Sequence, residues 1–282
     1  MTIRELLNQG IIMLKNEKID SPKTKARLIL ESTLNKSREY LIIYDKNEVT
    51  SAQRDNYIKK IKRVILGEPV QYITGLQEFM KLNFFVTKDV LIPRQDTEVL
   101  VEEVIKIAKD IPNPVILDLC TGSGAIAVSL AKYIPNSKIY GIDISEKALE
   151  VAKKNAEFNG VKNSIEFRVS DLFNKIRNQK FDIIVSNPPY IRSNVINNLP
   201  KQVQNEPHLA LDGGEDGLKF YKKIIEQSCN YIENGYLILE IGYDQKEDVE
   251  NLLKENKNYS EIKTIQDFSG NDRCTIAKVG KI

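Results

Sequence analysis

The sequence predicts an α/β protein with a mostly parallel sheet, preceded by a small domain of helices. Beyond residue 93, short apolar runs alternate with amphipathic helical stretches, a pattern typical of parallel strands joined by helices. Residues 1–75 show helical periodicity instead. Residues 76–92 are rich in aromatic and β-branched residues and predict a β-hairpin linker. We therefore expect domains at 1–75 and 93–282, joined by 76–92.

Composition narrows the class of protein. With 282 residues, of which 41% are hydrophobic, the chain can bury a sizeable core. A net charge of +2 argues against a protein that coats nucleic acid. The three cysteines lie far apart without metal-ligand spacing, which favours reduced thiols and no metal site. We find no signal peptide and no apolar run of membrane-spanning length, so we expect a cytoplasmic protein that does not bind membranes.

The N-terminal domain is expected to be a bundle of four helices. The first begins near Ile3, and the second follows a Ser21-Pro22 start signal. Helical stretches around 38–44 and 52–66 follow, and Gly67 ends the last one. Residues 1–75 carry 14 Lys and Arg against 9 Asp and Glu, an excess of +5. This surface either docks a partner or is a solvated charged face.

The second domain opens with a helix and a glycine-rich loop. Asp96 or Thr97 is a reasonable N-cap for the helix that follows. A buried strand at 115–119 then runs into a loop whose glycines let the backbone approach a ligand, and the next helix start offers free N–H groups. The loop residues are Cys120, Thr121, Gly122, Ser123 and Gly124.

Acidic residues follow the next two strands. The strand at 138–142 ends at Asp143, roughly twenty residues past the glycine loop, where an acid usually accepts hydrogen bonds from ribose hydroxyls. The strand at 165–169 leads to Asp171 and Leu172. These positions predict a nucleoside-containing cofactor at the carboxyl ends of the strands.

The fourth strand, 183–185, is followed by Asn187-Pro188-Pro189-Tyr190. The two prolines lack an N–H and hold the chain as a stiff arm that leaves the sheet. The Asn187 carbonyl and the backbone carbonyl of Pro188 are two acceptors that a planar –NH₂ group could satisfy together. Tyr190 supplies an aromatic face for a flat amide or base. A proline-rich turn after a core strand is the alternative.

The remaining elements complete the sheet. An irregular segment at 206–217 looks like a loop that folds over a site, and its His208, the only histidine, is expected to be structural rather than catalytic. Helices at 218–232 and 246–253, a strand at 236–241 and a terminal strand pair follow. The turn between the last two strands falls at 269–272.

Two kinds of cofactor fit the glycine loop. The loop formally matches G-x-G-x-x-[GA], so a nicotinamide dehydrogenase is a rival, although that match alone is weak. The combination favours S-adenosylmethionine. A glycine loop, Asp143, Asp171 and the Asn187 arm follow successive strands, and a dehydrogenase has no use for that arm.

The sequence resembles the peptide chain release factor glutamine methyltransferases over almost its whole length. The resemblance is carried by L-I-P-R-Q-D-T-E at 91–98, D-L-C-T-G-S-G-A-I-A at 118–127, G-I-D at 141–143, S-N-P-P-Y-I at 186–191 and E-P-H-L-A-L-D-G-G-E-D-G-L at 206–218. It implies a Rossmann-like methyltransferase domain, a seven-stranded sheet with an antiparallel C-terminal strand, and a substrate-docking N-terminal domain. The implied reaction moves a methyl group from S-adenosylmethionine to the amide nitrogen of the glutamine in the Gly-Gly-Gln motif of class I release factors.

The resemblance also implies roles for the site residues. Cofactor binding falls on 120–124, Asp143, Asp171, Leu172 and Asn187, and glutamine binding and catalysis on 187–190. Cys120 stands where the family commonly has glycine, which is tolerable only if that position needs no positive φ. Leu172 stands where an aromatic residue is often found. We expect a monomer without stable nucleic-acid binding. An adenine N6-methyltransferase acting on DNA or RNA, and a non-catalytic scaffold, are the alternatives.

Overall fold

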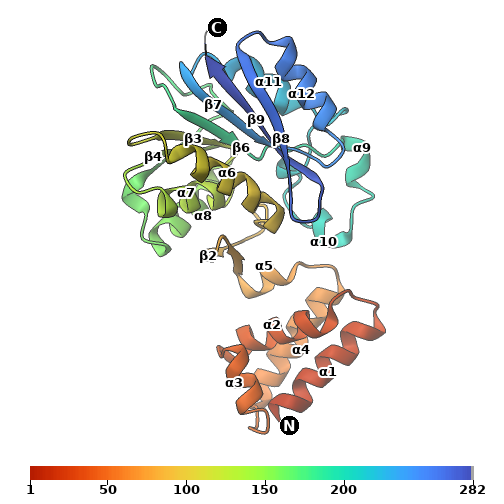
Figure 1. Ribbon diagram of the computed structural model, residues 1–282. Coiled ribbons are helices and arrows are strands. Elements are labelled where there is room, and N and C mark those ends of the chain that lie inside the picture. Colours follow the sequence, from red (N-terminus) through yellow and green to blue (C-terminus); the bar gives the residue numbers. More distant parts are fainter. Residues whose placement is uncertain (281–282) are drawn as a thin grey trace. The chain divides into compact units, whose positions relative to one another are not determined.

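The structure is a computed structural model that describes residues 1–280, and it divides into two compact units (Figure 1). The first comprises Met1–Leu76 together with Pro200–Asn205, and the second comprises Gln77–Leu199 and Glu206–Ile282. A segment far along the chain therefore packs with the N-terminal helices. None of the described helices is both long and apolar enough to cross a membrane.

The first unit is a bundle of helices with its own apolar core. Leu6, Leu14, Ile29, Leu30 and Ile61 are among its fully buried side chains. Its elements are α1 (Ile3–Asn16), α2 (Pro22–Leu34), α3 (Arg38–Ile43), α4 (Ser51–Ile65), α5 (Val70–Thr74) and α10 (Lys201–Gln204). The sequence pattern did not predict the short α5 and α10.

Side-chain caps define where these helices begin. Thr2 and Thr50 each accept a hydrogen bond from the amide three residues on, and the side chains of Glu5 and Gln53 accept one from the cap amide in return. Such capping boxes satisfy amides that a helix start leaves free. The amide of Asn205 donates to the Gly67 carbonyl at 2.9 Å, which fastens α10 to the end of α4.

The second unit contains a seven-stranded sheet in the order β5-β4-β3-β6-β7-β9-β8. Its strands are β3 (Val115–Leu119), β4 (Lys138–Asp143), β5 (Ile165–Val169), β6 (Ile183–Ser186), β7 (Asn234–Glu240), β8 (Tyr259–Gln266) and β9 (Asp272–Gly280). The pairings among β3 to β7 are parallel, and β9 is antiparallel to both β7 and β8. The predicted fold class is confirmed.

Helices cover both faces of this sheet, because successive side chains of each buried strand point to opposite sides. Ile116 packs on one face with α6 (Glu98–Ala108) and α7 (Ala125–Tyr133), and α8 (Glu146–Phe158) lies beside them. Leu117 packs on the other face with α11 (Lys219–Ser228) and α12 (Lys246–Glu255). Figure 1 shows the two layers of helices around the strands.

The chain changes sides of the sheet between β5 and β6. Strands β4 and β5 extend from one edge of β3, and β6 pairs with its other edge. In open α/β sheets, ligands bind outside the carboxyl ends of the strands at such a switch point. Cys120 follows β3 and Asn187 follows β6, so the fold brings the glycine loop and the proline arm to this place.

The hairpin of β1 (Leu76–Phe79) and β2 (Leu82–Phe85) packs almost entirely with the second unit. The rings of Phe79 and Phe84 meet edge to face with centroids 6.0 Å apart, within the core on the α6–α8 side. The Asn155 side chain of α8 exchanges two hydrogen bonds with the Phe85 backbone. The hairpin predicted within residues 76–92 is thus present, and it packs into the core of the second unit.

Candidate active site

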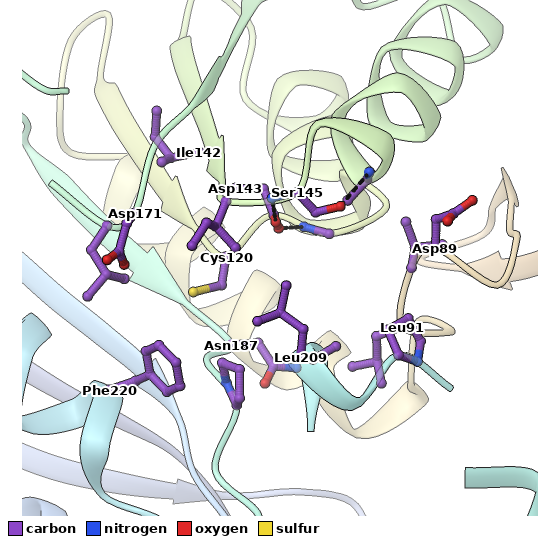
Figure 2. Close-up of a pocket in the computed structure, with 18 of the residues that line it drawn as sticks. Asp89, Leu91, Cys120, Ile142, Asp143, Ser145, Asp171, Asn187, Leu209 and Phe220 are labelled. Atoms are coloured by element: carbon purple, nitrogen blue, oxygen red, sulfur yellow. Dashed lines mark hydrogen bonds between the residues drawn. The ribbon is translucent and has the colours of Figure 1, made fainter. Parts of the chain in front are cut away.

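A cavity of about 260 Å³ lies in the second unit at the carboxyl ends of β3 to β6 (Figure 2). Its wall joins residues that are distant in sequence but converge at the switch point. The residues that line it include Cys120, Gly122, Asp143, Asp171, Leu172, Asn187, Pro189, Leu209 and Phe220. In Figure 2 the side chains of Asp171, Cys120, Asn187 and Phe220 surround the same space.

The glycine loop reverses the chain at the end of β3. Cys120, Gly122 and Gly124 all have positive φ, at 59°, 54° and 77°. A Cβ on Gly124 would lie 3.0 Å from the Cβ of Ala152 on α8, so glycine also allows close packing there. The condition that position 120 needs no positive φ is therefore not met. The turn requires a left-handed residue, and Cys120 adopts that conformation at a cost of about 1–2 kcal/mol.

Asp118 supports the loop from below. Its Oδ2 accepts from the Thr121 hydroxyl at 2.5 Å and from the Ala127 amide at 3.2 Å, while Oδ1 has no partner among the described residues. The side chain is fully buried, and burial raises the pKa of Asp118 to about 7. A single carboxyl thus ties the end of β3 to the loop and to the first turn of α7.

Asp143 connects the loop to the start of α8. Its Oδ2 accepts from the Gly122 amide at 2.8 Å, and its Oδ1 accepts from the Ser145 amide at 2.8 Å. Burial raises the pKa of Asp143, and these two amides oppose that rise. Each carboxyl oxygen keeps a lone pair, so the group can also accept from hydroxyls of a ligand in the cavity.

The third strand end supplies Asp171 and Leu172. The backbone turns sharply there, since Leu172 has a φ of 46° and its carbonyl accepts from the Ser170 hydroxyl at 2.9 Å. Leu172 and Ile142 give this part of the cavity an apolar surface. Phe220, from the first turn of α11, adds an aromatic ring to the same wall.

The proline arm leaves the sheet after Ser186, whose hydroxyl donates to the Leu119 carbonyl at 2.8 Å. Asn187 and Pro189 line the cavity, whereas Pro188 and Tyr190 are not part of its wall. The Asn187 side-chain nitrogen donates to the Thr97 hydroxyl at 3.3 Å. The Tyr190 hydroxyl donates to Glu240 at 3.3 Å, and burial raises the pKa of Tyr190.

Thr97 precedes α6, as expected of an N-cap, but its hydroxyl caps no amide of that helix. The turn Gln95–Thr97 is a 3₁₀ helix that runs directly into α6, so the chain enters the helix without an extended cap residue. The Thr97 hydroxyl instead meets the Asn187 amide. The prediction that the Thr97 side chain caps α6 was therefore wrong.

The segment after α10 returns to the cavity. Glu206 is buried, and its two oxygens accept from the Ile92 amide and the Arg94 guanidinium. Pro207 and Leu209 then line the cavity, as the prediction of a loop over a site requires. His208 points away, with 69% of its side chain exposed, and lies 3.8 Å from Asp212. His208 is not part of the cavity wall.

The predicted residues separate into two groups. Seven of them line the main cavity directly: Cys120, Gly122, Asp143, Asp171, Leu172, Asn187 and Pro189. Thr121 and Ser123 line an adjoining space of about 50 Å³ that shares Cys120, Gly122 and Asn187 with the main cavity. Gly124, Pro188 and Tyr190 lie outside both. Within residues 1–280, no group of His, Cys, Asp or Glu side chains is arranged to hold a metal ion.

Among the residues around the site that sequence reasoning missed are Leu91, Thr97 as a hydrogen-bond acceptor, Phe220 and Glu240. Glu240 was detectable in principle. It is an acid near the end of an otherwise apolar run, Tyr236 to Ile241. An acid at the carboxyl end of a strand in a parallel sheet lies at the edge where ligands bind. Phe220 carried no comparable signal, because its pattern is that of an ordinary amphipathic helix.

The fold and the matched family models define a methyltransferase. Residues 112–277 match the model described as a methyltransferase domain, and residues 5–75 match the PrmC N-terminal domain. The crystal structure of a methyltransferase from Pyrococcus furiosus shares this fold, with a TM-score of 0.53 and 19% identity over 79% of this chain and 99% of that one.

Sequence relatives narrow the class to one family. A release factor glutamine methyltransferase from Moorella thermoacetica is 39% identical over 98% of both chains. One of the same name from Aliivibrio fischeri is 38% identical over 99% of this chain and 98% of that one. The chain belongs to the release factor glutamine methyltransferase family, which confirms the resemblance seen in the sequence.

Proposed function

We propose that this chain transfers a methyl group from S-adenosylmethionine to the side-chain amide nitrogen of the glutamine in the Gly-Gly-Gln motif of class I peptide chain release factors. One observation carries the proposal beyond family membership. Asn187 lies in the wall that the cofactor loop also forms, and its nitrogen is engaged by Thr97. Its Oδ1 is thereby left as an acceptor beside the cavity.

The residues present fit the cofactor. Asp143 offers carboxyl oxygens to ribose hydroxyls, and Leu172 and Phe220 give apolar and aromatic surface for a base. Amides in the first turn of α7 can donate hydrogen bonds to the polar end of a ligand. When bound, S-adenosylmethionine supplies a methyl carbon activated by a positively charged sulfur. Among residues 1–280, Lys88 is the one basic residue that lines the cavity, so repulsion of that charge by the walls is small.

The chain's own part in the reaction is to hold the amide. Asn187 Oδ1 and the Pro188 carbonyl each accept one hydrogen of the glutamine –NH₂ group, which fixes the plane of the amide. As the nitrogen forms the new bond to the methyl carbon, the carbon–sulfur bond would break and its electron pair would stay on sulfur, which becomes a neutral thioether. The surplus proton of the nitrogen leaves to water afterwards. Tyr190 holds the arm in place. Positioning of this kind lowers barriers by roughly 7–11 kcal/mol in favourable cases.

Residues 1–75 dock the release factor in this proposal. The excess of basic residues and an exposed apolar end of α3 support it, because Ile42 and Ile43 keep 65% and 69% of their surface in water. Ile42→Asp together with Ile43→Asp should raise KM for the factor about tenfold and leave kcat unchanged. Ile12→Asp, which alters an exposed residue of α1, is the matched control. An unchanged KM would place docking elsewhere.

The reaction is tested by incubating the pure protein with radiolabelled S-adenosylmethionine. A release factor, the same factor with Gln→Ala in its Gly-Gly-Gln motif, bulk RNA and bulk DNA are offered in parallel. Label on the intact factor alone is expected. Label on nucleic acid would mean that the arm binds adenine, and label on nothing, despite cofactor binding, would favour a scaffold.

A further inference from the structure

Two segments that lie far apart in sequence form one part of the cavity wall. One follows β2 and supplies residues 88–91, and the other follows α10 and supplies Pro207, Leu209 and Ala210. Figure 2 shows Leu91 and Leu209, one from each segment, beside the same space. Leu209 lines the cavity and is also 54% exposed, so it lies where the cavity meets solvent. The segments 88–91 and 207–210 thus form a covering wall.

A buried carboxylate fastens the two segments of the covering wall to each other. Glu206 directly precedes Pro207, and only 2% of its side chain is exposed. Its Oε2 accepts a hydrogen bond from the amide of Ile92 at 3.0 Å, and Ile92 directly follows Leu91. Its Oε1 accepts from the guanidinium of Arg94. These two bonds join residues that are 114 and 112 positions apart in sequence.

The burial of Glu206 makes this link depend on both of its partners. A carboxylate loses its hydration when it is buried, and hydrogen bonds together with an opposite charge must replace the water. Here the Ile92 amide and the Arg94 guanidinium replace it. Neutralising Glu206 or altering Arg94 should therefore loosen the link, because a broken buried pair leaves one group without its partner. The two segments would then move separately.

We propose that Glu206 is a positioning residue for the cofactor, which holds the covering wall closed over bound S-adenosylmethionine and so slows its release. Glu206 does not line the cavity itself, so it acts through its neighbour Pro207 and through Leu91, the neighbour of Ile92. This role rests on the cofactor of the proposed function and not on the identity of the amide that receives the methyl group.

The release rate of the cofactor separates this role from a purely structural one. Glu206→Gln keeps the size of the side chain but removes its charge, so koff for S-adenosylmethionine should rise about tenfold, measured by surface plasmon resonance on immobilised protein. The association rate should change less than about threefold. Glu103→Gln is the matched control, because it neutralises a buried acid that pairs with Lys106 away from the cavity. Both variants should lower Tm, whereas only Glu206→Gln should change koff.

Variants of Arg94 show whether the two residues act as one unit. Arg94→Lys keeps the charge but loses the forked guanidinium, so koff should rise about threefold. Arg94 also lines the adjoining space of about 50 Å³, and the double variant separates that contact from the link. With Arg94→Ala present, adding Glu206→Gln should raise koff by no more than about twofold, because the link is already broken. Effects that multiply would overturn the link.

Hydrogen exchange of the Ile92 amide, followed by NMR, needs neither turnover nor a variant. This amide donates to Glu206, so its exchange should be slow in the unaltered chain. It should slow about tenfold further when S-adenosylhomocysteine, the form of the cofactor without its methyl group, fills the cavity. In Glu206→Ala it should be at least about tenfold faster.

Two results would overturn the role of Glu206. One is a koff in Glu206→Gln within about twofold of that of the unaltered chain. The other is exchange at Ile92 that bound S-adenosylhomocysteine leaves unchanged, and this result decides the question even where a variant does not fold. Faster cofactor release in Glu206→Gln, without methylation of any release factor by the unaltered chain, would instead remove the proposed function and leave the covering wall standing.

Discussion

The two sides of the cavity are each supported by one buried carboxyl, yet they are built in different ways. On the cofactor side, Asp118 holds the glycine loop through Thr121 and Ala127, which lie three and nine residues away in sequence. On the amide side, Glu240 holds Tyr190 across 50 residues of chain, and Asn187 meets Thr97 across 90. The first support is local and depends on backbone conformation, whereas the second exists only once β6, β7 and α6 have packed.

The difference predicts which property each side controls. On the cofactor side, the backbone sets the shape of the site through the positive φ values of Cys120, Gly122 and Leu172. Substituting a side chain there should therefore change the affinity for a bound ligand. The amide side presents one side-chain oxygen whose placement depends on partners. Substitutions there should therefore change kcat and leave cofactor affinity nearly intact.

The largest effect is expected for Asn187→Ala. It removes an acceptor that contacts the reacting amide, so kcat should fall by about 10²–10³, the range seen when a single hydrogen-bonding group is removed from a reaction centre. Cofactor Kd, measured by calorimetry, should change less than about threefold. A kcat within about tenfold of the unaltered chain, equivalent to roughly 1.4 kcal/mol, would contradict the two-acceptor mechanism.

The opposite result is expected for Asp143→Ala on the cofactor side. Loss of charged hydrogen bonds to ribose hydroxyls, worth about 1.5–3 kcal/mol, should weaken cofactor Kd about 10- to 100-fold. At saturating cofactor, kcat should recover to within a few fold. The control is Asp110→Ala, an acid in the loop after α6 that does not line the cavity. A large loss of kcat at saturation would show that the two sides are not separable.

The difference between contacts that are local in sequence and contacts between distant residues also explains which features the sequence can predict. The order of strands and helices follows from short apolar runs and glycine signals. Cys120, Asp143, Asp171 and Asn187 all lie at the last residue of a strand or within two residues after it. A pattern of that kind is visible along the chain because strand ends meet at one edge of a parallel sheet. The sequence alone therefore predicts these cavity residues.

Residues that reach the site only through tertiary packing were not predictable in this way. The sequence pattern predicts a helix cap at Thr97 and an ordinary amphipathic helix around Phe220. Such a local pattern carries no information about which residues pack against an element in the fold. Packing of α10 with the first unit, through Asn205 and Gly67, is likewise a contact across 138 residues. Backbone conformation is also hard to predict. Cys120 has a left-handed backbone, which its residue type does not reveal.

The carboxyl behind the arm also predicts how stability depends on pH. Burial raises the pKa of Glu240 from 4.5 to about 7, against the opposing effects of Thr97, Arg273 and Tyr190. Asp96, Cys274 and Tyr221 also face this carboxyl. A group whose pKa is raised in the folded state binds more protons there than when unfolded. Stability should therefore fall as pH rises from about 4.5 to 7.

Glu240→Gln removes this titration. Its advantage in Tm over the unaltered chain should grow by roughly 5–10 °C between pH 5 and pH 8, as measured by calorimetry, given about 2–4 °C per kcal/mol for domains of this size. Ser129→Ala, which changes a buried side chain without a titrating group, should not show that growth. A constant difference across the pH range would mean that Glu240 is already ionised at pH 5.

The smallest effect is expected for Cys120→Gly, which tests the backbone nature of the cofactor side. Glycine removes a left-handed strain of about 1–2 kcal/mol but adds roughly 0.5–1 kcal/mol of unfolded-state entropy. The two nearly cancel, so Tm should change by less than about 3 °C. Cofactor Kd should stay within about threefold, because the loop amides keep their places. Cys120→Val, whose branched Cβ resists this φ of 59°, should instead lower Tm and cofactor affinity together. Equal tolerance of glycine and valine would show that the loop does not depend on the conformation at this position.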